Sequence, residues 1–412
     1  MAGDQGGMEP ADVLVVGGGP AGSVAAITLA RAGRRVVLID KARFPREKTC
    51  GDGLTAGALR LLDDLGFEPD SVPSWHPVDK VVLTSPSGSR RTFPLERPGL
   101  HAVVARRSEL DHALLAMAAD AGAEIHEGTA LAEARQTDDR VIVRTDNGQE
   151  LTGRYILGAD GMWSPLRKTL GVAEPGYRGE WHAFRQYVSN VTGPGAHELH
   201  VVFDQRILPG YFWAFPLADG RANIGFGIQR GGKVEIQAMK QLWPTLLADP
   251  AVTEILGPDT EPEAPHRAWP IPARVGRVDL HVDRALFIGD AAAVTDPLTG
   301  EGIAQAMETG RWAAQAIITY GPDRPAAVSE QYQGAVEQNL VADHRLANLL
   351  SRAISTQFGA EWSIRLAGSS AWSRRNFARW LFEDYPRAIL VTPRRWRRRV
   401  FDRPGGFAST PR

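Results

Sequence analysis

Six consecutive small residues near the start of the chain have the spacing of a phosphate-binding loop. They read Gly17-Gly18-Gly19-Pro20-Ala21-Gly22 and satisfy the pattern G-x-G-x-x-G. An apolar strand expected at 13–16 precedes them and a helix expected at 21–32 follows, so backbone amides and a helix N-terminus can approach a pyrophosphate. Asp40 ends a second expected strand at 35–40, where its carboxylate can hold a ribose hydroxyl. An ordinary glycine turn is the alternative, but the complete β-α-β unit predicts dinucleotide binding.

Two later segments indicate which dinucleotide binds. Gly158-Ala159-Asp160-Gly161 ends an expected strand, and residues 284–302 run from an apolar strand through Gly289-Asp290 to the glycines before a helix expected at 303–318. Carboxylates at strand ends can bind a ribityl hydroxyl, and the helix N-terminus can face the edge of a flavin where negative charge gathers on reduction. The three segments together resemble the FAD-binding set of the para-hydroxybenzoate-hydroxylase-like flavoproteins, in the same order over residues 13–320.

This resemblance implies an FAD cofactor and a set of residues around it. An arginine in the stretch RSELD resembles one that this superfamily puts beside the FAD phosphates or ribityl chain, although a surface arginine at a helix start would look the same. The implied cofactor-binding residues are Gly17, Gly19, Pro20, Ala21, Gly22, Asp40, Lys41, Cys50, Gly51, Arg107, Asp160, Gly161, Gly289, Asp290, Pro297, Gly300, Glu301, Gly302 and Ile303.

Residues 211–227, YFWAFPLADGRANIGFG, carry a row of aromatic side chains. In a strand, Tyr211, Trp213 and Phe215 point to one face, because side chains alternate between the two faces. Such a row can line a slot for a polyisoprenoid chain, whose alkenes offer only apolar contact. Gly225 and Gly227 on the neighbouring strand would leave room for that ligand. The alternative is that these aromatics only pack the sheet against the flavin domain.

Three stretches resemble the geranylgeranyl reductase family, including its menaquinone-reductase branch. They are FPREKTCGDGL at 44–54, DPLTGEGI at 296–303, and a Y-x-W-x-F-P pattern followed by G-x-G. The resemblance implies a reductase that saturates carbon–carbon double bonds of a polyprenyl chain by hydride transfer from reduced flavin. It implies substrate contacts at Tyr211, Trp213, Phe215, Pro216, Gly225 and Gly227, and catalytic roles for Cys50, Asp52, Tyr211 and Trp213.

Cys50 and Asp52 lie in the loop that this family places near the isoalloxazine ring. A thiol of low pKa there could relay a proton to an alkene carbon, but a cysteine can equally be a small buried apolar residue. Asp52 occupies a position that many family members fill with glycine, as in the commoner CGGGL, whereas CGDGL resembles the quinone-directed branch. This departure bears directly on the local proton chemistry.

Two other functions share these motifs. One is an FAD-dependent monooxygenase, but YFWAFP differs from the W-x-W-x-I-P of halogenases, and no histidine follows the alanines after Asp290 as in aromatic hydroxylases. The other is a flavoprotein that binds a prenylated ligand without turnover.

The chain has no second G-x-G-x-x-G after a strand, so NAD(P)H would have to visit a groove over the flavin, or a reduced electron carrier would replace it. The stretch His197-Glu198-Leu199-His200 lacks the H-E-x-x-H spacing, so no metal site is expected.

These motifs require an α/β frame that is interrupted by a β-rich insertion. We expect a Rossmann-like FAD-binding domain with an inserted antiparallel β-sheet substrate domain and a C-terminal helical region. The expected segments are 10–70, 101–170 and 276–322 for the FAD-binding parts, 71–100 and 171–275 for the substrate domain, and 323–412 for the helical region with a basic, aromatic-rich tail.

The composition limits the partners. The 412 residues carry a net charge of −1, which gives no global electrostatic footprint for nucleic acid. A single cysteine and an N-terminus without the pattern of a signal peptide suit the cytoplasm. Residues 372–403 hold ten arginines against Glu383, Asp384 and Asp402, interleaved with tryptophan and phenylalanine, a composition typical of a membrane-surface anchor. A solvated helical face or a nucleic-acid patch would have a similar composition, and the sequence predicts no oligomeric state.

Overall fold

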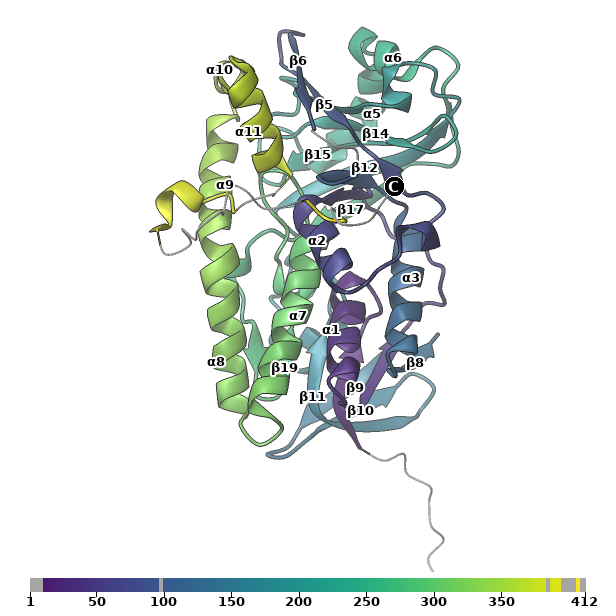
Figure 1. The fold of residues 1–412 in the computed structure, drawn as a ribbon, viewed down its shortest axis with the longest axis vertical. Helices are drawn as coiled ribbons and strands as arrows, with labels where there is room; N and C mark the ends of the chain where they lie inside the picture. The colour runs from purple at the N-terminus through teal and green to yellow at the C-terminus, as the bar shows by residue number, and fades with distance from the viewer. Residues whose placement is uncertain (1–9, 96–98, 383–385, 394–404, 408–412) are drawn as a thin grey trace, which may run out of the picture.

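A mixed eight-stranded sheet forms the lower half of the molecule in Figure 1. The computed structural model describes residues 10–95, 99–382, 386–393 and 405–407. The central strands run in the order β19-β11-β1-β2-β8 and pair in parallel. The strands of this sheet are β1 (Ala11–Val16), β2 (Val36–Asp40), β8 (Glu124–Glu127), β9 (Leu131–Gln136), β10 (Val141–Thr145), β11 (Glu150–Gly158), β18 (His281–Val282) and β19 (Ala285–Phe287).

The first sheet holds the glycine loop at the carboxyl end of β1. Helices α1 (Pro20–Arg31), α3 (Arg107–Asp120) and α7 (Ile303–Tyr320) lie against one face of the sheet (Figure 1). Gly17 has a φ of +108°, and a Cβ added there would lie 2.3 Å from the Ala159 carbonyl oxygen. A Cβ at Gly22 would lie 1.9 Å from the Gly17 carbonyl oxygen. Glycine is therefore required for this close approach of α1 to the sheet.

A second eight-stranded sheet fills the upper half of Figure 1. Its pairs are antiparallel except for the parallel pair β5–β13. Phe212, Ala214 and Phe226 lie in a core on one face of this sheet, together with Trp243 of α5. The strands are β5 (Lys80–Thr84), β6 (Arg90–Pro94), β12 (Trp181–Ser189), β13 (Leu199–Val202), β14 (Phe212–Leu217), β15 (Arg221–Gln229), β16 (Glu261–Pro262) and β17 (Arg267–Ile271), and the helices beside them are α5 (Met239–Leu247) and α6 (Pro250–Leu256).

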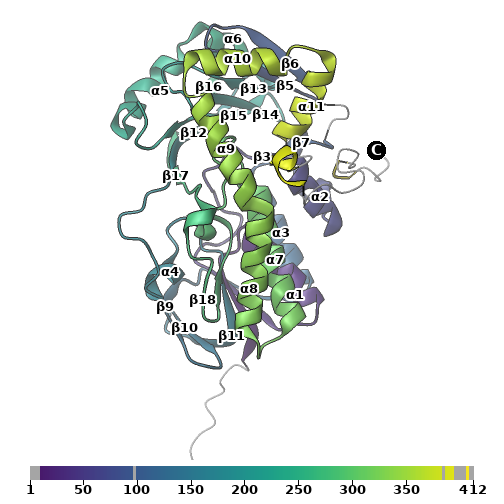
Figure 2. The same ribbon diagram turned by 90° about the vertical axis from the view of Figure 1, so that its left-hand side faces the viewer.

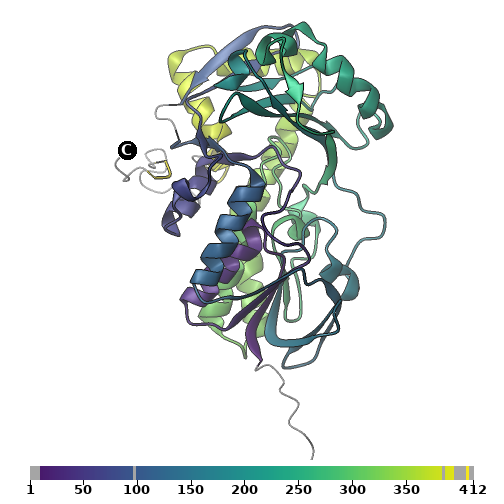
Figure 3. The same cartoon turned by 90° about the vertical axis from the view of Figure 1, so that its right-hand side faces the viewer.

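Two further groups of elements connect the halves. A small sheet holds β3 (Gly53–Thr55), β7 (Ala102–Val104) and β4 (His76–Pro77), with α2 (Ala56–Asp64) after β3. Helices α8 (Pro325–Val336) and α9 (Ala342–Ala353) run from the lower to the upper half, where α10 (Gln357–Ala367) and α11 (Ala371–Leu381) follow (Figures 1 and 2). Figure 3 shows the side opposite to that of Figure 2, with α3 in front of α1 and the strands of the first sheet beside them. The short helix α4 (Pro165–Thr169) follows β11.

The α/β architecture predicted from the sequence is confirmed. The expected strands at 13–16 and 35–40 correspond to β1 and β2, and the expected helix at 303–318 corresponds to α7. Asn147-Gly148 lies in the turn of the hairpin that joins β10 to β11. Among the described residues, no helix combines the length and apolar character that crossing a membrane would need. Of the arginine-rich segment 372–403, residues 383–385 and 394–403 lie outside the described residues, among them Glu383, Asp384, Trp396, Phe401 and Asp402.

Candidate active site

A cavity of about 840 Å³ is lined by residues from both large sheets. The three motifs expected to bind FAD meet in it, and so do the aromatic row and the Cys50 loop. The expected site residues that line it are Gly17, Gly19, Pro20, Ala21, Asp40, Lys41, Cys50, Gly51, Asp52, Arg107, Asp160, Gly161, Tyr211, Trp213, Phe215, Gly289, Asp290, Gly300, Glu301, Gly302 and Ile303. The expected site residues outside its lining are Gly22, Pro216, Gly225, Gly227 and Pro297.

Two arginines lie beside the glycine loop at one end of the cavity. Arg107 of α3 donates to both carboxylate oxygens of the fully buried Asp111, at 2.7 and 2.8 Å, and Arg46 lies 3.1 Å from the same carboxylate. Burial disfavours the charged form of Arg107, but Asp111 outweighs it and raises the pKa above the ordinary value. A Cβ added at Gly19 would lie 3.5 Å from Arg46 Nη2. Two fixed cations beside open glycine backbone suit a pyrophosphate. The sequence interpretation had not singled out Arg46.

The Asp40 carboxylate lies at the cavity wall, where the sequence predicted that it would bind a ribose hydroxyl. Its Oδ2 accepts from the Gly18 amide at 2.7 Å and its Oδ1 accepts from the Ala42 amide at 2.8 Å. The carboxylate therefore fixes the glycine loop, and it also lines the cavity. Each oxygen keeps a further lone pair for a hydroxyl donor.

Asp160 carries an unsatisfied oxygen. Its Oδ2 accepts from the Leu166 amide at 2.8 Å, whereas its Oδ1 is enclosed with no partner among the described residues. Burial raises the pKa of Asp160 to about 6. A buried acceptor without a donor is costly, so this oxygen is suited to receive a hydroxyl from a bound ligand.

We predict that Asp160→Asn stabilises the FAD-free protein above neutral pH. The pKa of Asp160 in the folded protein, about 6, exceeds the unfolded value of about 3.9, so wild-type stability falls as pH rises between these values. Two pKa units correspond to up to about 3 kcal/mol. The free energies of unfolding of the two proteins, measured with denaturant, should agree near pH 4. By pH 7.5 they should differ, with the variant more stable. A constant difference across this range would contradict the raised pKa.

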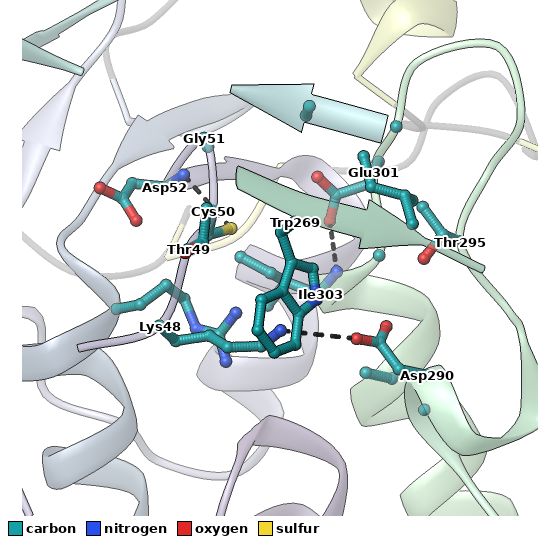
Figure 4. Close-up of a pocket in the computed structure, with 18 of the residues that line it drawn as sticks. Lys48, Thr49, Cys50, Gly51, Asp52, Trp269, Asp290, Thr295, Glu301 and Ile303 are labelled. Atoms are coloured by element: carbon teal, nitrogen blue, oxygen red, sulfur yellow. Dashed lines mark hydrogen bonds and ion pairs between the residues drawn. The ribbon is translucent and has the colours of Figure 1, made fainter. Parts of the chain in front are cut away.

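Lys48 bridges the Cys50 loop to the third FAD motif. Its Nζ lies 3.8 Å from Asp290 Oδ2 and 3.9 Å from the centre of the Trp269 ring, and Figure 4 shows these three side chains together. Burial lowers the pKa of Lys48, and Asp290 opposes that shift. Lys48 lies within the stretch FPREKTCGDGL, but no local sequence pattern indicates that Asp290 and Trp269 are its partners. Trp269, on β17, was missed altogether.

Glu301 caps helix α7. Its Oε1 accepts from the amide of Ile303, as Figure 4 shows, and from the amide of Ala304, both at 3.0 Å. These first-turn amides were expected to face a flavin edge, and here a side chain of the same loop satisfies them. Asp296 accepts from the amides of Leu298 and Thr299 and thereby shapes this loop.

Cys50 is half-buried in the cavity wall. Its Sγ accepts from the Asp52 amide at 3.4 Å, so the thiol proton remains available for donation. Burial raises the pKa of the Cys50 thiol, although Arg107 opposes this shift. The sequence-based idea of a low-pKa thiol is therefore wrong: the group is a neutral thiol near pH 7.

Asp52 lies behind Cys50 with no exposed surface. Its φ of +64° explains why glycine suits this position, since few other residues adopt that conformation. Its Oδ2 accepts from the Tyr187 hydroxyl at 2.6 Å and from Asn223 Nδ2 at 2.8 Å. Burial raises the pKa of Asp52 despite these donors and Arg185. The carboxyl group thus ties the loop to strands β12 and β15.

The aromatic row has the alternation that the sequence predicted. Tyr211, Trp213 and Phe215 line the cavity, with ring centres 6.2 Å apart at each step, while Phe212 lies in the opposite core. The Tyr211 hydroxyl donates to the Thr299 carbonyl oxygen. Beyond this row the cavity becomes apolar, where strands and C-terminal helices contribute Leu83, Leu199, Val201, Phe203, Leu350, Ile354, Ile364, Phe377 and Phe382.

Gly225 has a different neighbour from the one expected. A Cβ there would lie 2.2 Å from Trp213 Cζ2, so the Trp213 indole fills the space that was assigned to a ligand. The Trp213 Nε1 donates to Asn223 Oδ1 at 3.1 Å, which joins the aromatic row to the Asp52 network. A Cβ added at Gly227 would lie near only His182 and Ala183, at 3.8 and 4.0 Å.

The polar end of the cavity fits FAD. Backbone beside Gly161 is open, with nothing within 4 Å of an added Cβ. Together with the unsatisfied Asp160 oxygen and the two arginines, it gives donors for phosphates and acceptors for hydroxyls.

Comparison with known proteins agrees with this geometry. Residues 10–320 match the family of FAD binding domains. A menaquinone reductase of Mycolicibacterium smegmatis is 35% identical over 350 residues, covering 78% of this chain and 81% of its own. Digeranylgeranylglycerophospholipid reductase 1 of Methanopyrus kandleri is 33% identical over 340 residues, covering 79% of this chain and 86% of its own.

Solved structures share the fold. A geranylgeranyl bacteriochlorophyll reductase-like protein of Thermoplasma acidophilum superposes with a TM-score of 0.77 at 21% identity, over 94% of this chain and 100% of that one. A halogenase solved with FAD superposes with a TM-score of 0.72 at 19% identity, over 91% and 83%. At these identities the likeness concerns the fold alone.

Proposed function

Because this chain belongs to the geranylgeranyl reductase family of FAD-dependent oxidoreductases, we propose that it saturates carbon–carbon double bonds of a polyprenyl chain on a lipid, a quinone or a prenylated natural product. One observation carries the proposal. A single cavity joins a polar end suited to FAD to an apolar end that continues from the aromatic row. The named substrates of the relatives, a menaquinone and a digeranylgeranyl lipid, both have chains that such an apolar end could hold.

The protein residues would divide the reaction between them. FAD, when bound and reduced, supplies the hydride. Trp213 and Phe215, which pack beside Gly51 of the Cys50 loop, would hold the alkene in the adjoining cavity and exclude water. The Cys50 thiol would give its proton to the second alkene carbon, so that two C–H bonds replace one π bond. Asp52 would position this loop, since the residue is fully buried and its carboxylate is held by Tyr187 and Asn223.

We predict that removal of the Asp52 carboxylate changes turnover less than tenfold. Asparagine and glycine both tolerate a φ of +64°, so Asp52→Asn and Asp52→Gly should fold. A buried acid that only positions the loop is expected to cost about threefold to tenfold, whereas loss of a proton donor costs about 10²–10⁴-fold. Single-turnover rates would decide. A fall of the larger size in both variants would make Asp52 the donor.

For the electron donor, we propose a reduced nicotinamide dinucleotide. A second, polar recess of about 510 Å³ shares Trp163 and Pro270 with the main cavity and is also lined by Arg178, His182 and Arg230. Burial and the neighbouring Arg178 lower the pKa of Arg230, as expected where guanidinium groups crowd together. Glu235 also lines the recess, but its two arginines outnumber that acid, which suits the phosphates of a nucleotide.

We predict that Arg230→Gln raises the KM for NADPH about tenfold, the loss expected for one charge-assisted phosphate contact. Turnover with dithionite as the reductant should not change, because dithionite needs no recess. Lys233→Gln, on the same exposed turn but outside the recess lining, is the control. An unchanged KM in Arg230→Gln would favour a protein electron carrier or another site for the nucleotide.

Anaerobic product analysis tests the proposed reaction. The purified flavoprotein is reduced with dithionite and mixed with geranylgeranyl lipids or menaquinone in detergent. The lipids are then extracted, and their molecular masses are measured by mass spectrometry. A gain of about two mass units per saturated bond, with flavin reoxidation in step, is expected. No gain without oxygen, but about sixteen units once air is admitted, would identify a monooxygenase. Binding without any mass change would identify a carrier.

A further inference from the structure

Helix α10 is apolar on two opposite faces. Its inner face buries Ala360, Ile364 and Ala367, and Ile364 lines the apolar end of the cavity. Its outer face exposes Phe358, Trp362 and Leu366, with exposed fractions of 72, 51 and 72%. Spacing of four residues places these three on one side of the helix. Packing in the folded protein accounts for the apolar inner face. A row of large apolar side chains exposed to water is unfavourable in the isolated molecule and is typical of an interaction site.

The segment of the chain that contains this outer face is basic. Residues 342–381, which span α9 to α11, carry six arginines and only two acids, Asp343 and Glu361. Asp343 accepts from the Ala388 amide and Glu361 from the Ser87 amide, so both acids are engaged within the protein. Arg365 lies over the Trp362 ring, 5.3 Å from its centre. Trp372, 75% exposed, lies in the first turn of α11, the next helix along the chain.

We propose that the outer face of α10, formed by Phe358, Trp362 and Leu366, docks on an anionic lipid bilayer. Aromatic and aliphatic side chains enter the interfacial layer, and arginines around them pair with lipid phosphates. Figure 1 shows α10 at the upper left of the molecule, and Figure 2 shows it in front of the second sheet. This docking brings the apolar end of the cavity to the surface that holds isoprenoid lipids, and only that last step rests on the proposed function.

Vesicle co-sedimentation of the full-length holoprotein tests the docking without any turnover. Vesicles are phosphatidylcholine alone, or phosphatidylcholine with about one third phosphatidylglycerol. Wild type should bind the anionic vesicles, and the double variant Phe358→Ser/Trp362→Ser should lose about tenfold or more of that binding. The control Gln357→Ser changes an exposed polar residue at the start of the same helix and should bind as wild type. Equal binding by the double variant would overturn the proposal.

Two further readouts separate the alternatives. Sedimentation velocity would show whether the wild type is a dimer that the double variant disrupts; this result, with unchanged vesicle binding, would assign the face to a second copy of the chain and overturn the proposal. FAD content checks the fold of each variant. Docking predicts that the double variant loses turnover on vesicle-embedded substrate while it keeps turnover on detergent-dispersed substrate. A reductase proposal that failed would leave the vesicle-binding result intact.

Discussion

Cys50→Ala is expected to lower the rate of alkene saturation by about 10²–10⁴-fold while FAD stays bound and reducible. The thiol accepts from the Asp52 amide and stands half-buried in the cavity wall, so its own proton is free to move toward a ligand. Alanine removes that proton but keeps a small apolar side chain. Anaerobic mixing of reduced enzyme with substrate would measure flavin reoxidation, and product mass would confirm saturation.

The pH profile gives an independent check. Burial raises the pKa of Cys50 above its ordinary value of about 8.5, and an acid catalyst must be protonated. The rate should therefore stay level through neutral pH and fall only on the alkaline side of the ordinary thiol pKa. Cys50→Ser, which keeps a hydroxyl of much higher pKa, should retain part of the rate and lose that alkaline limb. If Cys50→Ala kept its rate within about threefold, solvent would be the proton source.

The glycine loop and the aromatic row could be predicted because each depends on spacing within one short segment. Period-two alternation alone places Tyr211, Trp213 and Phe215 on one face. What lies opposite a face depends on contacts between distant segments. Tyr187 and Asn223 reach Asp52 from 135 and 171 residues away, and no local pattern indicates that. The same limit explains the misassigned space beside Gly225, which belongs to a ring on the next strand.

Surface placement was harder to predict than motif chemistry. Arginine-rich composition drew attention to residues 372–403, whereas the exposed apolar row lies earlier, on α10. In α10 both faces are apolar, so periodicity cannot separate the face that packs from the face that stays exposed. Only the position of α10 beside the cavity distinguishes them.

Trp213→Ala is expected to cost about 3–5 kcal/mol of stability and to remove most turnover on polyprenyl substrates. The indole is only 8% exposed, fills the space above Gly225, and donates to Asn223. Its loss leaves a void in the sheet, removes one wall of the proposed alkene slot, and frees the amide that holds Asp52. Trp213→Phe keeps a ring but no N–H donor, so it should be less destabilised.

A matched substitution on the same strand distinguishes a role of Trp213 in binding the substrate from a role in packing the sheet. Phe212 is fully buried in the core on the opposite face, so Phe212→Leu should lower the melting temperature without changing the KM for substrate. If Trp213 holds the alkene, Trp213→Phe should raise that KM at unchanged FAD content, and the increase should grow with chain length. If Trp213 only packs the sheet, both variants will behave alike. The aromatic row would then be part of the core, and the slot for the polyprenyl chain would have to lie among the C-terminal helices instead.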